Sequence, residues 1–311
     1  MGPWMGQPDP SGKFPGIYYQ FNEWRDFSDV IQLPHTNEVL FVDDVIEWLF
    51  LKRVGGVGQP DHPSETLVAN DIRLNDAEAL TTDGENFVYA CTAHALKKKD
   101  AKRRKPQAFL RFRIADRDWL LPDGVITNLR ETLAARYEFI RAIIDLRKKQ
   151  GGLNIEGLAW DAASGRLLFG LRAPLLGGSA ALLPVRIQSH ASFTVESLEF
   201  QDPITLGIPG KGIRSIQFDR KLNAFLILAG NVGKGTGSDF SLWLWGGAPG
   251  QMAQQFKAVR FREYFNPEGV TGVSLPTGEE FIFIVSDNGG GYLKLRYEEL
   301  GLDSGQTAIG R

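Results

Sequence analysis

The sequence predicts an all-β fold, a single closed β-propeller of five four-stranded blades. Three observations lead to this prediction: short apolar runs bounded by Gly, Pro, Asp and Asn, a local motif that recurs five times, and a composition with 35 glycines and 20 phenylalanines in 311 residues. Abundant glycine and phenylalanine are typical of tight turns between bulky strands. Six or seven blades are the alternatives, but they require strands that are not found in the sequence.

The recurring motif combines a small or turn residue, a charged residue and a small or branched residue, followed by a strand. Its five copies are Ser28-Asp29-Val30, Ala77-Glu78-Ala79, Ile155-Glu156-Gly157, Ile213-Arg214-Ser215 and Pro267-Glu268-Gly269. A turn and a second, very apolar strand come next, and two further strands usually follow. Four antiparallel strands in one unit are typical of a propeller blade.

The two ends of the chain are expected to meet in one blade. Little sequence follows the strand at residues 292–297, so the fifth unit lacks its last strand. Residues 17–21 form a predicted strand that has no blade of its own. We therefore expect this N-terminal strand to complete the last blade and close the ring, which removes an open sheet edge. The whole chain, residues 1–311, is then one domain.

The second unit carries two predicted insertions. Residues 97–105 contain seven Lys or Arg in nine positions, which indicates an exposed, solvated loop that a trypsin-like protease cuts first. An anion or nucleic-acid contact is the alternative interpretation of this basic loop. Residues 128–149 predict a helix with Asn128 as N-cap and an apolar stripe on one face. The stripe consists of Leu129, Leu133, Tyr137, Ile140 and Ile144.

Net charge, the N-terminal sequence and the cysteine count indicate where the protein is located and which partners it binds. A formal net charge of −2 gives no global reason to expect nucleic acid or a membrane surface as partner. The N-terminus has neither a basic start nor an apolar stretch typical of a signal peptide, and no run reaches 18 apolar residues. The single cysteine, Cys91, cannot form an internal disulfide, which fits a reducing compartment. We therefore expect a cytoplasmic protein that does not bind membranes.

The charged residue of each motif is expected to face the central channel, because the first strand of every propeller blade lines the axis. This ring consists of Asp29, Glu78, Glu156, Arg214 and Glu268. Four carboxylates in a narrow channel cannot all ionise unless a cation or hydrogen bonds compensate them. Carboxylate oxygens are ligands that Ca²⁺ prefers, so a bound calcium ion is one interpretation. A ring that holds only water, partly neutralised by Arg214, is the other.

One glycine-rich segment, residues 230–237, resembles a phosphate-binding loop at first sight. That motif requires a glycine six residues before its lysine, and Leu228 stands there instead. A strand rather than a helix is predicted to follow. The segment is therefore expected to be a hairpin loop.

Several of these motifs resemble a bacterial family catalogued as domain of unknown function 3616. The most specific match is Asn154-Ile-Glu-Gly-Leu-Ala-Trp160 followed by Leu168-Phe-Gly-Leu-Arg-Ala-Pro174, and the resemblance extends over most of the chain. In its Glu-Gly motifs this family is similar to the esterase-like phytase propellers, in which acidic residues at the channel bind calcium and phosphate. The resemblance implies metal contacts from Glu78, Glu156 and Glu268, with Arg172 and Arg214 facing an anion. Ser28-Asp29 departs from the glutamate pattern.

Two functions follow as hypotheses. The first is a non-catalytic interaction module that binds a protein partner, with or without a structural cation in the channel. It is favoured because no nucleophile or general base is recognisable and one blade carries large insertions. The second is a calcium-dependent hydrolase of phosphate or other anionic esters at the channel mouth, suggested by the carboxylates beside two arginines. The sequence assigns no catalytic residue and leaves open whether the protein is an enzyme.

Overall fold

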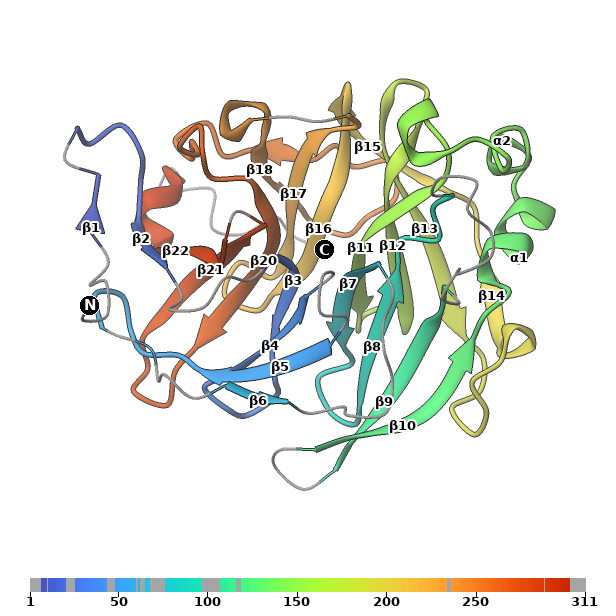
Figure 1. The fold of residues 1–311 in the computed structure, drawn as a ribbon, viewed down its shortest axis with the longest axis horizontal. Helices are drawn as coiled ribbons and strands as arrows, with labels where there is room; N and C mark the ends of the chain where they lie inside the picture. The colour runs from blue at the N-terminus through green and yellow to red at the C-terminus, as the bar shows by residue number, and fades with distance from the viewer. Residues whose placement is uncertain are drawn as a thin grey trace.

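The structure, a computed structural model, confirms a five-bladed, all-β propeller with four-stranded blades (Figure 1). It describes residues 7–9, 11–20, 26–43, 48–59, 61, 65–67, 76–96, 107–115, 119–233, 236–287 and 289–302. Each blade is a separate hydrogen-bonded antiparallel sheet. The basic loop predicted at residues 97–105 lies outside the described residues.

The first three blades follow one another along the chain. Blade 1 consists of β3 (Phe27–Gln32), β4 (Glu38–Asp43), β5 (Trp48–Arg53) and β6 (Glu65–Leu67). Blade 2 consists of β7 (Ala77–Thr82), β8 (Phe87–Thr92), β9 (Phe109–Ala115) and β10 (Trp119–Ile126). Blade 3 consists of β11 (Asn154–Asp161), β12 (Arg166–Leu176), β13 (Ser179–Ile187) and β14 (Leu198–Phe200), with β15 (Ile204–Pro209) also paired to β13.

The last two blades include the N-terminal strands. Blade 4 consists of β16 (Lys211–Asp219), β17 (Ala224–Asn231), β18 (Ser241–Trp245) and β19 (Gln254–Gln255). Blade 5 consists of β20 (Pro267–Ser274), β21 (Glu280–Ser286) and β22 (Gly291–Leu295), extended by β2 (Ile17–Gln20) and β1 (Gln7–Pro8). Because β2 pairs with β22, a strand from the start of the chain completes the sheet formed by its end.

The inner strands β3, β7, β11, β16 and β20 pack against one another in that order, and β20 packs against β3 to complete the ring. Hydrophobic side chains fill the space between neighbouring blades in five clusters, one at each junction. In every inner strand, the residue two positions after the bulge is apolar and fully buried. These residues are Val30, Leu80, Leu158, Ile216 and Val270.

All five inner strands carry a β-bulge near their first residues, where the register with the second strand shifts by one. A bulge re-aims a side chain and bends the strand locally. The five bulged residues are Ser28, Glu78, Glu156, Arg214 and Glu268. The bulge therefore marks equivalent positions in the five blades independently of the sequence motif.

The insertion between blades 2 and 3 differs from the single helix predicted at residues 128–149. It forms two short helices, α1 (Leu129–Arg136) and α2 (Glu138–Arg141), interrupted at Tyr137, whose backbone is extended at φ −117° and ψ 117°. Asn128 precedes α1, but its side chain makes no capping hydrogen bond. Without a cap, and with two turns in α1, the insertion depends on tertiary packing for its stability.

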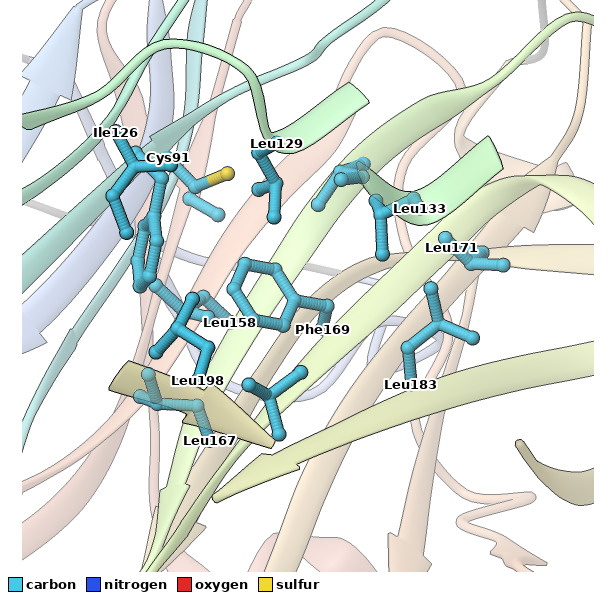
Figure 2. Packing of buried hydrophobic residues seen from close by; sticks show 14 of the residues in the cluster. Cys91, Ile126, Leu129, Leu133, Leu158, Leu167, Phe169, Leu171, Leu183 and Leu198 are labelled. Carbon is cyan, nitrogen blue, oxygen red and sulfur yellow. The ribbon is translucent and has the colours of Figure 1, made fainter. Parts of the chain in front are cut away.

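That packing is supplied by the junction between blades 2 and 3. Leu129 and Leu133 of α1 are fully buried and lie with Cys91 and Phe169 in one cluster (Figure 2). The predicted apolar stripe is thus correct although the helix is broken: four of its residues are buried in this cluster, and Ile144 packs against it partly buried. After α2 the chain returns to the propeller, where Arg147 forms a bridge with Leu96. Among the described residues, no helix is long and apolar enough to cross a membrane.

Candidate binding site at the channel mouth

The axis of the propeller has two distinct ends. All inner strands begin at one end, here called the mouth end, and turn into the second strands at the other, here called the turn end. The insertion starts after β10 and ends before β11, so both its termini lie at the mouth end. It therefore stands at the same end of the axis as the five bulges.

Four of the predicted ring residues lie together at the mouth end, and Asp29 does not share their position. Glu78, Glu156, Arg214 and Glu268 are the bulged residues of blades 2 to 5, while Ser28 is the bulged residue of blade 1. Asp29 follows one position later and belongs to the layer below. The sequence motif treats the charged residue of each copy as the equivalent position. In the structure the equivalent position is the bulged residue, which in blade 1 is Ser28 and not Asp29.

Glu156 is the centre of an ion-pair network that joins blades 2 to 5. Its Oε1 accepts hydrogen bonds from Arg172 Nη1 at 2.8 Å and from Asn154 Nδ2 at 2.7 Å, and its Oε2 lies 2.9 Å from Arg214 Nη1. Arg214 also pairs with Glu268 through its other terminal nitrogen. Only 1% of the Glu156 side chain is exposed, so these partners replace the water that an ionised carboxylate needs.

The network contains one residue that the sequence did not reveal, Lys148. Its Nζ lies 3.2 Å from Glu78 Oε1 and 3.0 Å from Glu156 Oε1. It belongs to the 3-10 turn Lys148–Gln150, held in place by a hydrogen bond from the Lys148 amide to the Leu96 carbonyl. A continuous helix over 128–149 would not predict that this lysine lies at the axis. Because the helix ends early, the chain returns to the propeller and places Lys148 beside Glu78 and Glu156.

The two neighbouring glutamates have opposite pKa shifts. Burial raises the pKa of Glu78 to about 8, and the adjacent Glu156 carboxylate adds to this effect while Lys148 opposes it. Burial would also raise the pKa of Glu156, but Arg214, Lys148 and Arg172 outweigh it and hold that pKa below its ordinary value. At neutral pH, Glu156 is therefore the ionised member of the pair and Glu78 the more protonated one.

Below the mouth, hydrogen bonds between blades close the axis. Asp29 Oδ2 accepts a hydrogen bond from the Leu80 amide at 2.7 Å, and its Oδ1 accepts one from Ser215 Oγ at 2.8 Å. Ser215 Oγ in turn accepts from the Val270 amide at 3.2 Å. One layer further down, Gln217 Nε2 donates to the carbonyls of Leu80 and Leu158. Asp29 thus connects blade 1 to blades 2 and 4.

The predicted calcium ligands are engaged with cationic side chains. Ca²⁺ takes six to eight oxygen ligands, whereas Lys148, Arg172 and Arg214 supply positive charge to the carboxylates from nitrogen atoms. Within the described part of the chain, no group of three or more His, Cys, Asp or Glu side chains is arranged to hold a metal ion. A calcium ion bound to these carboxylates would have to displace Lys148 from Glu78 and Glu156.

A cavity of about 510 Å³ lies at the turn end, away from the charged network. Residues from all five blades line it, including Trp160, Gln217 and Tyr297. Its buried carboxylate, Asp219, accepts a hydrogen bond from the Tyr297 hydroxyl at 2.6 Å and one from the Leu222 amide at 2.8 Å. The Asp219 carboxylate is therefore hydrogen-bonded within the protein. The ion-pair network around Glu156 lies at the opposite end of the axis.

Comparisons with known proteins confirm the resemblance and the fold. Residues 120–273 match the family described as "Protein of unknown function (DUF3616)". A similar solved structure is the major allergen Mala s 1 of Malassezia sympodialis, at 13% identity and a TM-score of 0.54, covering 92% of this chain and 98% of the allergen. Glutaminyl cyclase of Myxococcus xanthus shows 12% identity and a TM-score of 0.48, covering 90% and 93% of the two chains. The comparison with curated proteins gives no match.

Proposed function

We propose a function from the geometry, because the family that residues 120–273 match is described only as a protein of unknown function (DUF3616). The chain is a non-catalytic binding propeller that presents its mouth end, with the insertion at residues 127–153, to a protein partner. The observation that carries this proposal is the mutual pairing of the charged groups at the mouth. Glu156 and Glu268 lie within ion-pair contact of Lys148 or Arg214, and Glu78 accepts a hydrogen bond from Lys148 at 3.2 Å.

This pairing favours a scaffold over a catalytic centre. A general base or nucleophile must reach a substrate with its reactive atom uncommitted, and a metal-dependent site keeps an open coordination position. In the network, Glu156 Oε1 accepts a hydrogen bond from Arg172, its Oε2 lies 2.9 Å from Arg214 Nη1, and the Arg214 side chain is 6% exposed. The arrangement fixes blades 2 to 5 to one another and gives the mouth end a rigid shape. Rigid surfaces lose less entropy on binding a partner.

The insertion supports the choice of the mouth end as the binding surface. Its inner face is buried against blades 2 and 3, so its position is fixed. Its outer face exposes four basic residues and three acidic ones: Arg136, Arg141, Arg147, Lys149, Glu131, Glu138 and Asp145. The basic stretch 97–105 begins directly after Leu96, which bridges to Arg147. The excess of positive charge suits an acidic protein surface.

Charge reversal tests the proposal. The variant Arg141→Glu with Lys149→Glu changes two exposed residues of the insertion, and the control Arg186→Glu with Arg220→Glu changes two exposed residues elsewhere. Partners are captured by cross-linking in cells and then titrated in purified form. We expect the insertion variant to bind about tenfold more weakly, mainly at low salt, because rim charges act through screened electrostatics. Equal affinity in both variants would rule out this surface.

Hydrolysis of anionic esters is the second candidate, and one observation favours it. Glu78 and Glu156 are adjacent carboxyl groups with pKa values shifted apart, an arrangement that many acid–base catalysts use. The assay measures hydrolysis of p-nitrophenyl phosphate and p-nitrophenyl acetate, with and without Ca²⁺, and thermal melts under the same conditions. A rate that Glu78→Gln abolishes would replace the binding proposal. A melting point raised by Ca²⁺ but not in Glu156→Gln would place calcium at the mouth.

A further inference from the structure

A second cavity, of about 490 Å³, lies at the mouth end beside blade 4. Its walls come from the first residue of β16, the loop between β17 and β18, the end of β19 with the segment that follows it, and Phe14 near the N-terminus. The lining residues are Phe14, Lys211, Gly237, Ser238, Phe240, Gln255, Lys257, Val259, Arg260 and Phe261. The volume is in the range of cavities that hold small molecules.

Three of the lining residues are cationic and none is acidic. Lys211, Lys257 and Arg260 project three positive charges onto this cavity in a chain whose formal net charge is −2. Among the described residues, none of the three forms an ion pair. In the ion-pair network around Glu156, by contrast, Lys148, Arg172 and Arg214 each have a carboxylate partner. The cavity therefore concentrates unneutralised positive charge.

Lys211 is the most informative of the three because it is partly buried. Its Nζ donates a hydrogen bond to Ser241 Oγ at 3.0 Å, and the indole nitrogen of Trp243 donates to the same oxygen at 2.8 Å. Burial lowers the pKa of Lys211, and the more distant Asp239 opposes this shift. The Asp239 carboxylate itself accepts a hydrogen bond from the Thr236 amide at 2.7 Å. Lys211 is thus a partly desolvated cation whose direct partner is neutral.

The remaining walls are apolar and aromatic. Phe240, Val259 and Phe261 are buried, and Phe14 covers one side. Phe240 also lies under the Arg214 guanidinium, 5.6 Å from its ring centroid, so the cavity borders the ion-pair network. Apolar walls require a ligand with an apolar body, since a small hydrated anion alone would leave them without contacts.

We propose that this cavity binds an organic anion, one with an aromatic or aliphatic body and a single carboxylate, sulfonate or phosphate group. The anionic group would lie against Lys211, and the positive charges of Lys257 and Arg260 would also attract it. The apolar body would lie against the three phenylalanine rings. This site is separate from the protein-binding surface of the insertion. Its existence does not depend on the proposed function.

The experiment uses 1-anilinonaphthalene-8-sulfonate as a fluorescent probe, displaced by 1-naphthoate or by the neutral 1-naphthalenemethanol. In the natural chain we expect 1-naphthoate to displace the probe at about tenfold lower concentration than the alcohol, because the charged contact adds to the same apolar body. In Lys211→Met this preference disappears. The matched control, Lys221→Met, changes a lysine at the turn end and keeps the preference.

Three outcomes would overturn the proposal. Equal displacement by acid and alcohol in the natural chain would show an apolar cavity without anion recognition. If inorganic phosphate displaced the probe at the same concentration as 1-naphthoate, the site would be a charged surface that does not recognise the apolar part of a ligand. A preference that survives in Lys211→Met would place the anion elsewhere. If Lys211→Met does not fold, as judged by circular dichroism, Lys257→Gln with Arg260→Gln tests the same cavity from its exposed rim.

Discussion

The first blade and the other four begin their inner strands with the same bulge but with different side chains. Blades 2 to 5 place Glu78, Glu156, Arg214 and Glu268 at the bulge, and blade 1 places Ser28 there. The next position reverses the pattern: blade 1 has Asp29, and the others have Ala79, Gly157, Ser215 and Gly269. A shift of one residue thus moves a carboxylate from the layer of ion pairs to the layer beneath it.

The two layers give their carboxylates opposite properties. Glu156 is surrounded by Arg214, Lys148 and Arg172, and its pKa lies below the ordinary value. Burial raises the pKa of Asp29 well above its ordinary value, because its partners are the Leu80 amide and the Ser215 hydroxyl rather than a cation. Both side chains are fully buried. The partners, rather than the depth of burial, therefore decide which carboxyl group carries a charge.

The largest expected effect is that of Glu156→Gln. This change leaves Arg172, Arg214 and Lys148 without their shared counter-charge, so we expect a loss of about 3–5 kcal/mol in the free energy of unfolding, as for other broken buried ion pairs. The measurement is urea denaturation at pH 7. Because the folded pKa of Glu156 is lowered, its stabilisation exists above pH 4.5 and is lost as the pH falls, and the difference between the proteins shrinks below pH 4.5.

A double-mutant cycle separates the ion pair from other effects of that change. Arg214→Met removes the partner that joins Glu156 to Glu268. If the network acts as one unit, the double variant costs less than the sum of the two single variants, with a coupling energy of about 1–3 kcal/mol. Additive losses would show that Glu156 and Arg214 contribute to stability separately, which would contradict the network.

Asp29→Asn tests the layer beneath the ion pairs. We expect it to raise the free energy of unfolding, whereas Glu156→Gln lowers it, and the size of the effect to be intermediate. The amide imitates the protonated carboxyl group, since its oxygen can accept from the Leu80 amide and its nitrogen can face Ser215. A raised folded pKa means that the contribution of Asp29 is fully present below its unfolded pKa and is lost as the pH rises. We therefore expect the variant to gain stability relative to the natural chain above pH 4, by at most about 1.4 kcal/mol per pH unit.

The measurement for Asp29→Asn is the free energy of unfolding at pH 4, 6 and 8. Near pH 4 the two proteins should agree to about 1 kcal/mol, the contribution of one rearranged hydrogen bond. A variant that is equally destabilised at all three pH values would show that Asp29 is ionised in the folded protein. The comparison between the layers would then fail.

The fold could be predicted from the sequence because a propeller repeats its local design. Each blade has its own inner strand, turn and apolar second strand, so five weak signals add up to one architecture. The apolar stripe of the insertion was also visible, with Leu129 and Leu133 in the predicted core. The break at Tyr137 was not, because the residues around it favour a helix and tertiary contacts decide the outcome. One such contact is the hydrogen bond from the Tyr137 hydroxyl to the Gln201 carbonyl.

The site could be predicted only in part. Four of the five ring residues were identified by their charge, but the register of Asp29 depends on a bulge that the sequence does not display. Lys148 was missed because its role requires the broken helix and the bridge between Leu96 and Arg147. The cavity beside Lys211 joins segments from residue 14 to residue 261, and no local motif connects them.

The smallest expected effect is that of Ser28→Ala, at the one bulge position without a charge. Ser28 is buried, 7% exposed, and its side chain carries no counter-charge for the network. We expect the free energy of unfolding to change by about 0.5 kcal/mol or less, whereas Glu268→Ala, at the equivalent position of blade 5, costs about 3 kcal/mol because Arg214 loses a partner. Both are measured by urea denaturation at pH 7. Equal losses at the two positions would mean that the bulge backbone, and not the charge placed on it, stabilises the mouth, since alanine removes the side chain in both blades.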